Sequence, residues 1–338
     1  MEILLYTIVF LLLLVVSNVT NRFLPQLPLP LVQIVLGISL GFLLPQGKFH
    51  LDTELFLALV IGPLLFREAE ESNITSILKH WRIVLYLIFP VIFISTVGLG
   101  HLAHLLWGAL PLAACVAVGA ALGPTDLVAF ASLSGRFSFP KRVENILKGE
   151  GLLNDASGLV AFRVALLAWT TGSFSLGKAS ISLVLSIIGG FAIGMLSAGL
   201  NRWLHKLLMS AQVSDIASEL LLELSLPLVT FFLAEEIHVS GIIAVVVAGI
   251  FKASRFKRIT LLEAQVDSVT ENIWNTVNFM LNGSVFIILG MELEMIAEPI
   301  LKSPIYDNLL LLVSIVLLTF LLFALRFIML FTFYFIRI

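Results

Sequence analysis

Apolar residues occur along this chain in long runs that short polar segments separate. About 20 mainly apolar residues cross the hydrocarbon layer of a membrane as an α-helix. Eleven runs approach or exceed that length, at approximately residues 2–18, 28–45, 53–66, 83–106, 109–134, 149–170, 179–201, 218–234, 239–251, 271–291 and 308–335. The third and ninth runs are short for a complete crossing. The pattern predicts an all-α polytopic membrane protein with about 11 transmembrane helices.

Composition narrows the function classes. Of 338 residues, 59% are hydrophobic and 12% are charged, whereas a soluble domain carries about 25% charged residues. This excludes a cytosolic enzyme, a disordered chain and a nucleic-acid binder. The single cysteine, Cys115, excludes a disulfide framework and a cysteine metal site. No nucleophile and base converge, so we expect a single transmembrane domain over 1–338, embedded in lipid, that is no enzyme and holds no cofactor.

Basic residues predict the orientation. If the N-terminus lies outside and eleven spans alternate, 15 of the 20 Lys and Arg residues fall in inside segments. Only Lys48, Lys178 and Lys302 fall outside, and Arg163 and Arg326 lie within spans. Because inside loops of membrane proteins are rich in Lys and Arg, the bias predicts a plasma-membrane protein with its N-terminus outside and its C-terminus in the cytoplasm.

Two aspartates lie within neighbouring spans. Asp126 is eight residues from the inside end of the fifth span, and Asp155 is seven residues into the sixth. At 1.5 Å per residue both lie roughly 10–12 Å deep. Ionisable groups at such depth are costly unless they are paired or hydrated, and they commonly mark ion or proton pathways. The pair therefore indicates a cation or proton site.

The sequence before Asp126 favours an interrupted helix. Gly123 relaxes the chain and Pro124 lacks an N–H group, so a break near 123–126 would expose carbonyls and the Thr125 hydroxyl as oxygen ligands. The alternative is a proline kink whose buried polar residue is satisfied by a neighbour. In the next span, Glu150 and Asn154 are four residues apart and share a helix face.

Two more charged residues within spans need partners. The Arg326 guanidinium stays charged, so it requires an anion or a hydrated cavity. Glu223 in the eighth span is also deep enough to require a partner. The glycine-rich patterns around Gly37 and Gly194 are typical of closely packed helices.

Several segments together resemble the monovalent cation/proton antiporter family, in the prokaryotic type of its sodium/proton exchanger branch. The most specific are GAALGPTDLVAFASLS at 119–134 and GEGLLNDASGLVAFRVAL at 149–166, and the match continues in PLPLVQIVLGISLG at 28–41 and LNGSVFIILGMEL at 281–293. The resemblance covers nearly the whole chain. It implies an inverted-repeat fold with two discontinuous helices that cross near the membrane centre, a homodimer, and alternating access.

The resemblance also assigns roles to individual residues. It implies that Thr125 and Asp126 belong to the first crossing helix, and that Asn154 and Asp155 form the Asn-Asp pair whose aspartate carries the ion and the proton. Transported Na⁺ would be held by Asp155, Asp126 and Thr125. Glu150 matches an acid near the ion site, and Arg326 best matches the arginine with which that acid pairs.

The expected function is electroneutral exchange of Na⁺, or Li⁺ or K⁺, for H⁺, in which cation and proton compete for Asp155. Three departures from the family pattern are visible: Leu127 follows Asp126 where a proline is usual, Gly151 replaces a common serine, and the second crossing helix is missing after the Arg326 helix. The last departure predicts a C-terminally incomplete antiporter domain. The alternative function is therefore an inactive truncated fragment, or a subunit that needs a partner chain.

Overall fold

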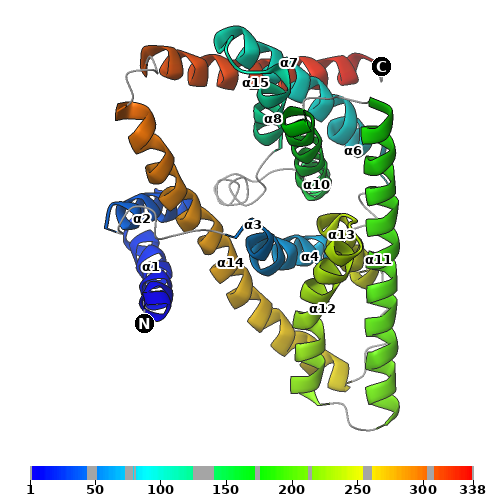
Figure 1. Cartoon of the computed structure of the whole chain (residues 1–338). Helices are drawn as coiled ribbons and strands as arrows, with labels where there is room; N and C mark the ends of the chain where they lie inside the picture. Colours follow the sequence, from blue (N-terminus) through cyan, green and yellow to red (C-terminus); the bar gives the residue numbers. More distant parts are fainter. Residues whose placement is uncertain are drawn as a thin grey trace. The chain divides into compact units, whose positions relative to one another are not determined.

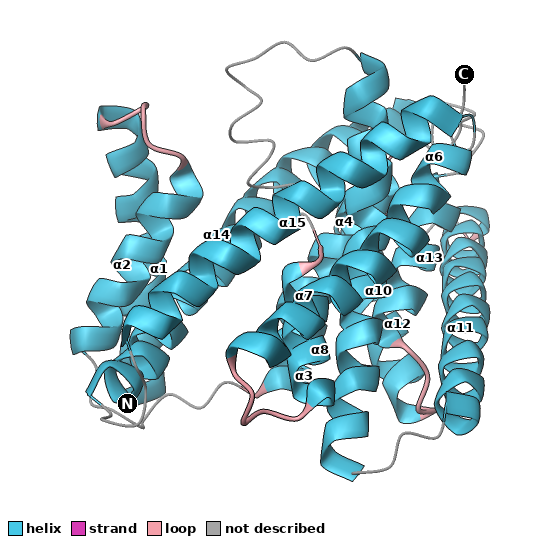
Figure 2. Ribbon diagram, turned by 90° about the horizontal axis from the view of Figure 1, so that it is seen from above, coloured by secondary structure: helices cyan, strands magenta, loops and turns pink. Residues whose placement is uncertain are grey.

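The structure, a computed structural model, describes residues 2–43, 52–72, 79, 81–124, 141–171, 176–211, 215–253, 261–302 and 308–336. All regular elements in these ranges are helices (Figures 1 and 2). Contacts divide the chain into two compact units. Unit 1 comprises 1–71, 128–138 and 189–302, and unit 2 comprises 72–127, 139–188 and 303–338.

Unit 1 contains the N-terminal helices and most of the helices between residues 189 and 302 of the sequence. Its elements are α1 (Glu2–Phe23), α2 (Leu29–Leu43), α3 (Thr53–Phe56), the π-helical turn η1 (Leu57–Ile61), α4 (Gly62–Glu71), the part of α11 (Leu176–Ser210) from residue 189 onward, α12 (Ile216–Glu236), α13 (Gly241–Ala253) and α14 (Leu261–Lys302). Asp215 caps α12, because its side chain accepts a hydrogen bond from the Ser218 backbone N–H at 2.9 Å. Hydrogen bonds from Ser218 also lower the pKa of Asp215.

Unit 2 contains the helices that carry the candidate site. Its elements are α6 (Trp81–Tyr86), the π-helical turn η2 (Leu87–Val91), α7 (Ile92–Leu106), α8 (Leu112–Leu122), α10 (Lys141–Thr171), the part of α11 before residue 189, and α15 (Asn308–Ile336). Helix α8 lies between α7 and α10 in Figure 1.

Ten of the predicted spans correspond to a helix, or to consecutive helical segments, in the described ranges, and α8 covers the first half of the fifth, whose residues from 125 onward lie outside those ranges. Four helical segments there are long and apolar enough to cross a membrane by length and composition: Val184–Ser210, Ile216–Glu236, Ser268–Ala297 and Leu309–Thr332. Six shorter apolar helices accompany them. The prediction of an all-α polytopic architecture is confirmed.

Close helix contact in unit 1 depends on glycine. A Cβ atom on Gly37 of α2 would lie 2.1 Å from the Ile287 carbonyl oxygen of α14, and one on Gly290 would lie 2.2 Å from the Ile34 oxygen. A Cβ atom on Gly194 of α11 would likewise lie 2.3 Å from the Ala244 carbonyl oxygen of α13. These contacts confirm that the glycine patterns permit tight packing. Figure 1 shows α2 beside α14.

In unit 2, α7 packs against both α8 and α15. A Cβ atom on Gly119 of α8 would lie 2.2 Å from the Thr96 carbonyl oxygen of α7, so the two backbones nearly touch. Trp107 donates to Ser314 at 3.1 Å near one end of the α7–α15 pair. Tyr86 donates to the Met329 carbonyl at 3.1 Å near the other end. Tyr86 ends α6 and Trp107 follows α7, so the chain from α6 to α7 runs antiparallel to α15.

Candidate ion-binding site

Arg326 connects three elements of unit 2. Its Nη2 donates to the Gly123 carbonyl oxygen, just after the end of α8. Its Nη1 lies 3.6 Å from Glu150 Oε1 on α10. Both side chains are largely buried, with 19% of Arg326 and 6% of Glu150 exposed. The structure therefore brings Arg326 and Glu150 together as a buried ion pair that also holds the end of α8.

One face of α10 is directed at this pair and at the end of α8. Glu150, Asn154 and Gly158 are spaced by four residues and so lie along the same face. Glu150 contacts Arg326, and a Cβ atom on Gly158 would lie only 2.2 Å from Pro124 Cγ. Asn154, between them, is completely buried. The predicted pairing of Glu150 and Asn154 on one face is thus present.

The end of α8 lies where the sequence predicts a break. The helix ends at Leu122, and Gly123 keeps helical backbone angles of φ −65° and ψ −45°. Pro124 then follows outside regular structure. Thr125 and Asp126, the two predicted ligands from this segment, lie outside the described residues.

Asp155 lies in the middle of the described part of α10. Its backbone belongs to the helix, one position after the buried Asn154, while its side chain lies outside the described part of the structure. Within the described residues, no group of three or more His, Cys, Asp and Glu side chains is arranged to hold a metal ion.

One positive and one negative side chain, Arg326 and Glu150, lie beside the C-terminal end of α8. The guanidinium of Arg326 and the carboxylate of Glu150 offset each other, which keeps both tolerable in a low-dielectric region. The C-terminal carbonyls of α8 add partial negative charge. Such a site provides oxygen atoms for a cation, and the balanced pair adds no net charge of its own.

The sequence that forms this site was compared with known protein families. The transmembrane sodium/hydrogen exchanger family matches residues 7–337. The chain belongs to the sodium/hydrogen exchanger family. Since this is a family of transporters with multiple apolar helices, the protein is a multi-pass membrane protein.

Relatives in this family are known from two Bacillus species. The sodium, potassium, lithium and rubidium/H⁺ antiporter of Bacillus subtilis is 38% identical over 328 residues, and that of Bacillus pumilus is 37% identical. Each match covers 97% of this chain and 49% of the relative. The chain thus spans about half the length of these exchangers.

A solved exchanger shares the fold. The sodium proton antiporter MjNhaP1 of Methanocaldococcus jannaschii superposes with a TM-score of 0.70 at 19% sequence identity, covering 94% of this chain and 77% of that one. This likeness confirms the antiporter fold class that the resemblance implies.

Unit 1 of this exchanger-family chain contains a second group of charges, which are partly buried. Lys252 of α13 binds Glu70 of α4 at 3.0 Å and Glu223 of α12 at 2.5 Å. Trp274 of α14 donates to the same Glu223 oxygen at 3.2 Å. Arg67 pairs with Glu70 at 3.0 Å. Glu223 thus has the partner that its depth requires.

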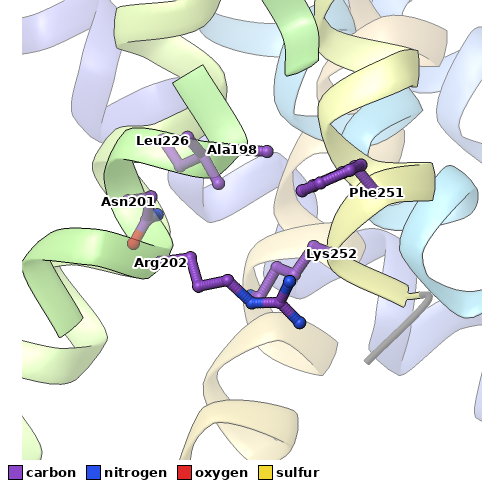
Figure 3. A pocket seen from close by; sticks show the side chains of 6 residues that line it. All are labelled: Ala198, Asn201, Arg202, Leu226, Phe251 and Lys252. Carbon is purple, nitrogen blue, oxygen red and sulfur yellow. The ribbon is translucent and has the colours of Figure 1, made fainter. Parts of the chain in front are cut away.

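A pocket lies beside this charged group, between α11, α12 and α13 (Figure 3). Its lining residues are Ala198, Asn201, Arg202, Leu226, Phe251 and Lys252. The Arg202 guanidinium lies over the Phe251 ring, 6.0 Å from its centroid. Lys252 pairs with two carboxylates, and Arg202 is the second basic side chain that lines the pocket.

Sequence reasoning overlooked the contacts that cross between helices. The charge pattern places Lys252 in the inside segment after the ninth predicted span, whereas in the structure it lies in the last turn of α13. A single threonine within an apolar run gives no signal of its own, so the sequence does not single out Thr96 of α7. In the structure, α7 and α8 approach each other most closely at Gly100 and Gly119.

Proposed function

We propose that the protein exchanges Na⁺, or Li⁺ or K⁺, for protons across the plasma membrane. Asp155 is the group for which cation and proton compete, and Thr125, Asp126 and the carbonyls at the end of α8 complete the oxygen shell. Burial disfavours the charged form of a carboxyl group, so a proton replaces a departing cation. This competition couples their opposite movements.

The observation that best supports this proposal is the Arg326–Glu150 pair bound to the Gly123 carbonyl. It joins α10, immediately before Asn154 and Asp155, to the end of the interrupted α8. A permanently charged guanidinium would be costly here without a counter-ion, and Glu150 supplies one. Since Glu150 is engaged with Arg326, Asp155 and Asp126 are the carboxylates that we propose for the transported ion.

Exchange is proposed to be electroneutral, because Asn154 carries no charge and one aspartate binds either one cation or one proton. The relatives' names, which refer to antiport of sodium, potassium, lithium and rubidium, favour exchange over an inactive fragment. We further propose that the N-terminus faces outside, that the C-terminus is cytoplasmic, and that the protein works as a homodimer.

The test is the collapse of a pH gradient in everted membrane vesicles. Addition of Na⁺, Li⁺ or K⁺ is expected to release protons from vesicles that contain the wild-type protein, and Asp155→Asn is expected to abolish the response while the protein still folds. Na⁺-dependent proton movement that survives in Asp155→Asn would contradict the proposal.

A matched control is Asp215→Asn. Asp215 is exposed at the start of α12, and its lowered pKa means that it is ionised at working pH. The control therefore removes a carboxylate charge by the same substitution. Because Asn also caps helices well, exchange by Asp215→Asn should match the wild type.

A further inference from the structure

One arginine in the pocket between α11, α12 and α13 has no acidic partner among the residues that the structure describes. Arg202 and Lys252 are the two basic residues that line this pocket, and Figure 3 shows the Arg202 side chain extending from α11 toward Lys252 on α13. Lys252 is paired with Glu70 and Glu223. No carboxylate in the described ranges lies within ion-pair distance of Arg202, so its charge is available to a ligand.

The acids on the surrounding helices are engaged with other cations. Glu70 of α4 is shared between Lys252 and Arg67, at 3.0 Å from each. Glu219 of α12, which faces α11, is bound to His205. These pairs keep the negative charges of unit 1 away from the Arg202 guanidinium, so an anion that binds there does not meet an unpaired carboxylate of this group.

The hydrogen-bond donors of Arg202 are also open. Within the described residues its guanidinium interacts with the Phe251 ring, 6.0 Å from the ring centroid. A ring face attracts the positive charge, but it provides no oxygen acceptor for the five N–H groups of a guanidinium. Arg202 is exposed, so a ligand can reach these groups. Because a guanidinium binds phosphate through two parallel N–H···O bonds, the pocket is suited to a phosphate group.

The pocket lies where two apolar runs end. Residues 179–201 and 239–251 contain no charged residue, and Arg202 and Lys252 directly follow these runs. The Asn201 side chain donates to the Leu222 carbonyl oxygen at 3.4 Å, so the same level of α12 is near the beginning of its predicted span. Because the ends of spanning helices lie in the headgroup region of a bilayer, Arg202 lies at the level of lipid phosphates.

The face of α11 that carries Arg202 changes from apolar to basic at this level. Phe191, Met195 and Arg202 are spaced by four and seven residues and so share one face of the helix. The two apolar side chains are exposed, by 53% and 40%. Lys206, four residues beyond Arg202 on the same face, is also exposed. This face therefore matches a phospholipid, with apolar contacts for an acyl chain below a basic position for its headgroup.

We propose that this pocket binds the headgroup of an anionic phospholipid, and that Arg202 binds its phosphate. The second N–H of the Asn201 amide and the positive charge of Lys252 face the same pocket. Basic pockets between transmembrane helices on the cytoplasmic side are typical of anionic headgroup recognition, and the Lys and Arg distribution predicts that side for Arg202. The site uses no residue of the proposed ion site, so it goes beyond the exchange function.

The test measures the rise in Tm that lipid causes in the purified chain in neutral detergent, which reports binding to the folded state. The probes are dioleoyl phosphatidylglycerol, which is anionic, and dioleoyl phosphatidylcholine, which has the same acyl chains and no net charge. Wild-type protein should respond to the anionic lipid at lower concentration. Arg202→Gln should raise the half-saturating concentration of the anionic lipid about fivefold, equivalent to the ~1 kcal/mol that one basic residue contributes near an anionic surface.

The matched control is Arg22→Gln. Arg22 is an exposed arginine in the last turn of α1, on the same predicted side of the membrane, and it does not line the pocket. Its substitution removes the same charge, and affinity for the anionic lipid should stay within about twofold of wild type. Arg202→Lys keeps the charge but loses the planar fork, so its affinity should fall between wild type and Arg202→Gln. Without lipid, the Tm of each variant should be close to wild type.

Four results would overturn the lipid site. Wild-type protein might as readily be stabilised by phosphatidylcholine as by phosphatidylglycerol, or Arg202→Gln might keep wild-type affinity for the anionic lipid. Equal weakening by Arg22→Gln and Arg202→Gln would show attraction by overall charge alone. An equal rise in Tm with inorganic phosphate or glycerol 3-phosphate would assign the pocket to a free phosphate. None of these results depends on cation exchange, which Asp155→Asn tests separately.

Discussion

Arg326 shows how a single residue determines the electrostatics of the candidate site. Its guanidinium cannot lose its proton in a protein, so the surrounding structure must supply an acceptor and a counter-ion. Gly123 supplies the acceptor and Glu150 the counter-ion. Sequence reasoning alone showed that Arg326 needs an anion, and the family resemblance named Glu150. The role of the pair in transport stays a prediction.

Removing only one partner of the Arg326–Glu150 pair should destabilise the folded protein. Arg326→Met leaves Glu150 buried without its cation, which we expect to lower the free energy of unfolding by about 3–5 kcal/mol. Adding Glu150→Gln should recover more than half of that loss, because the uncompensated charge is gone. Thermal unfolding in detergent should rank the wild type first, the double variant second and Arg326→Met last.

The control for this cycle is Glu71→Gln. Glu71 pairs with Arg67 at 2.7 Å, but 53% of its side chain is exposed. Exposed pairs contribute at most about 1 kcal/mol, so its Tm should stay close to wild type. If the double variant is no more stable than Arg326→Met, the two side chains do not interact as the structure indicates.

Among the helices, α8 and α10 define the site through close backbone contact. Pro124 follows the end of α8, and Gly158 of α10 packs directly against it. The sequence predicted the break from Gly123 and Pro124. The contact with Gly158 was not predicted, because a glycine in an apolar run gives no sign of which helix it faces.

Gly158→Ala should separate these two helices. A Cβ atom there would lie 2.2 Å from Pro124 Cγ and 3.1 Å from its Cδ. Overpacking of this kind costs about 1–3 kcal/mol, so the Tm in detergent should fall and Na⁺-driven proton release should slow. Gly199→Ala, at an open helix position, should leave both unchanged or raise the Tm slightly. A wild-type Tm in Gly158→Ala would argue against the contact.

Helix boundaries were the least predictable aspect of the fold. The apolar runs predicted where helices occur but not where they begin and end. Helix α10 begins at Lys141 rather than near 149, and α14 extends over Leu261–Lys302 rather than 271–291. The reason is physical: hydropathy marks the apolar part of a helix, whereas backbone hydrogen bonding continues into polar sequence at its ends. Thr125, Asp126 and the Asp155 side chain lie outside the described structure, so their roles stay predictions.

For the whole molecule, composition and the run pattern sufficed to predict a polytopic helical membrane protein. Family membership and the fold match to an antiporter confirm that class. The prediction of a single transmembrane domain is not tested by the division into two contact units. Orientation depends on the distribution of Lys and Arg across the loops, and it too stays a prediction.

Orientation is testable with single cysteines, because Cys115 is the only native one. In a Cys115→Ala background, Lys178→Cys is expected to react with a membrane-impermeant maleimide added to intact cells. Lys206→Cys should react only after the cells are opened. The reverse labelling pattern would place the N-terminus inside.

The central claim is that one carboxylate, Asp155, exchanges a cation for a proton. The most direct measurement is uptake of radioactive Na⁺ into proteoliposomes that hold an outward proton gradient. Wild-type protein should take up Na⁺ at a rate that does not change when a membrane potential is imposed, and Asp155→Asn should take up none. Uptake by Asp155→Asn at the wild-type rate would contradict the account.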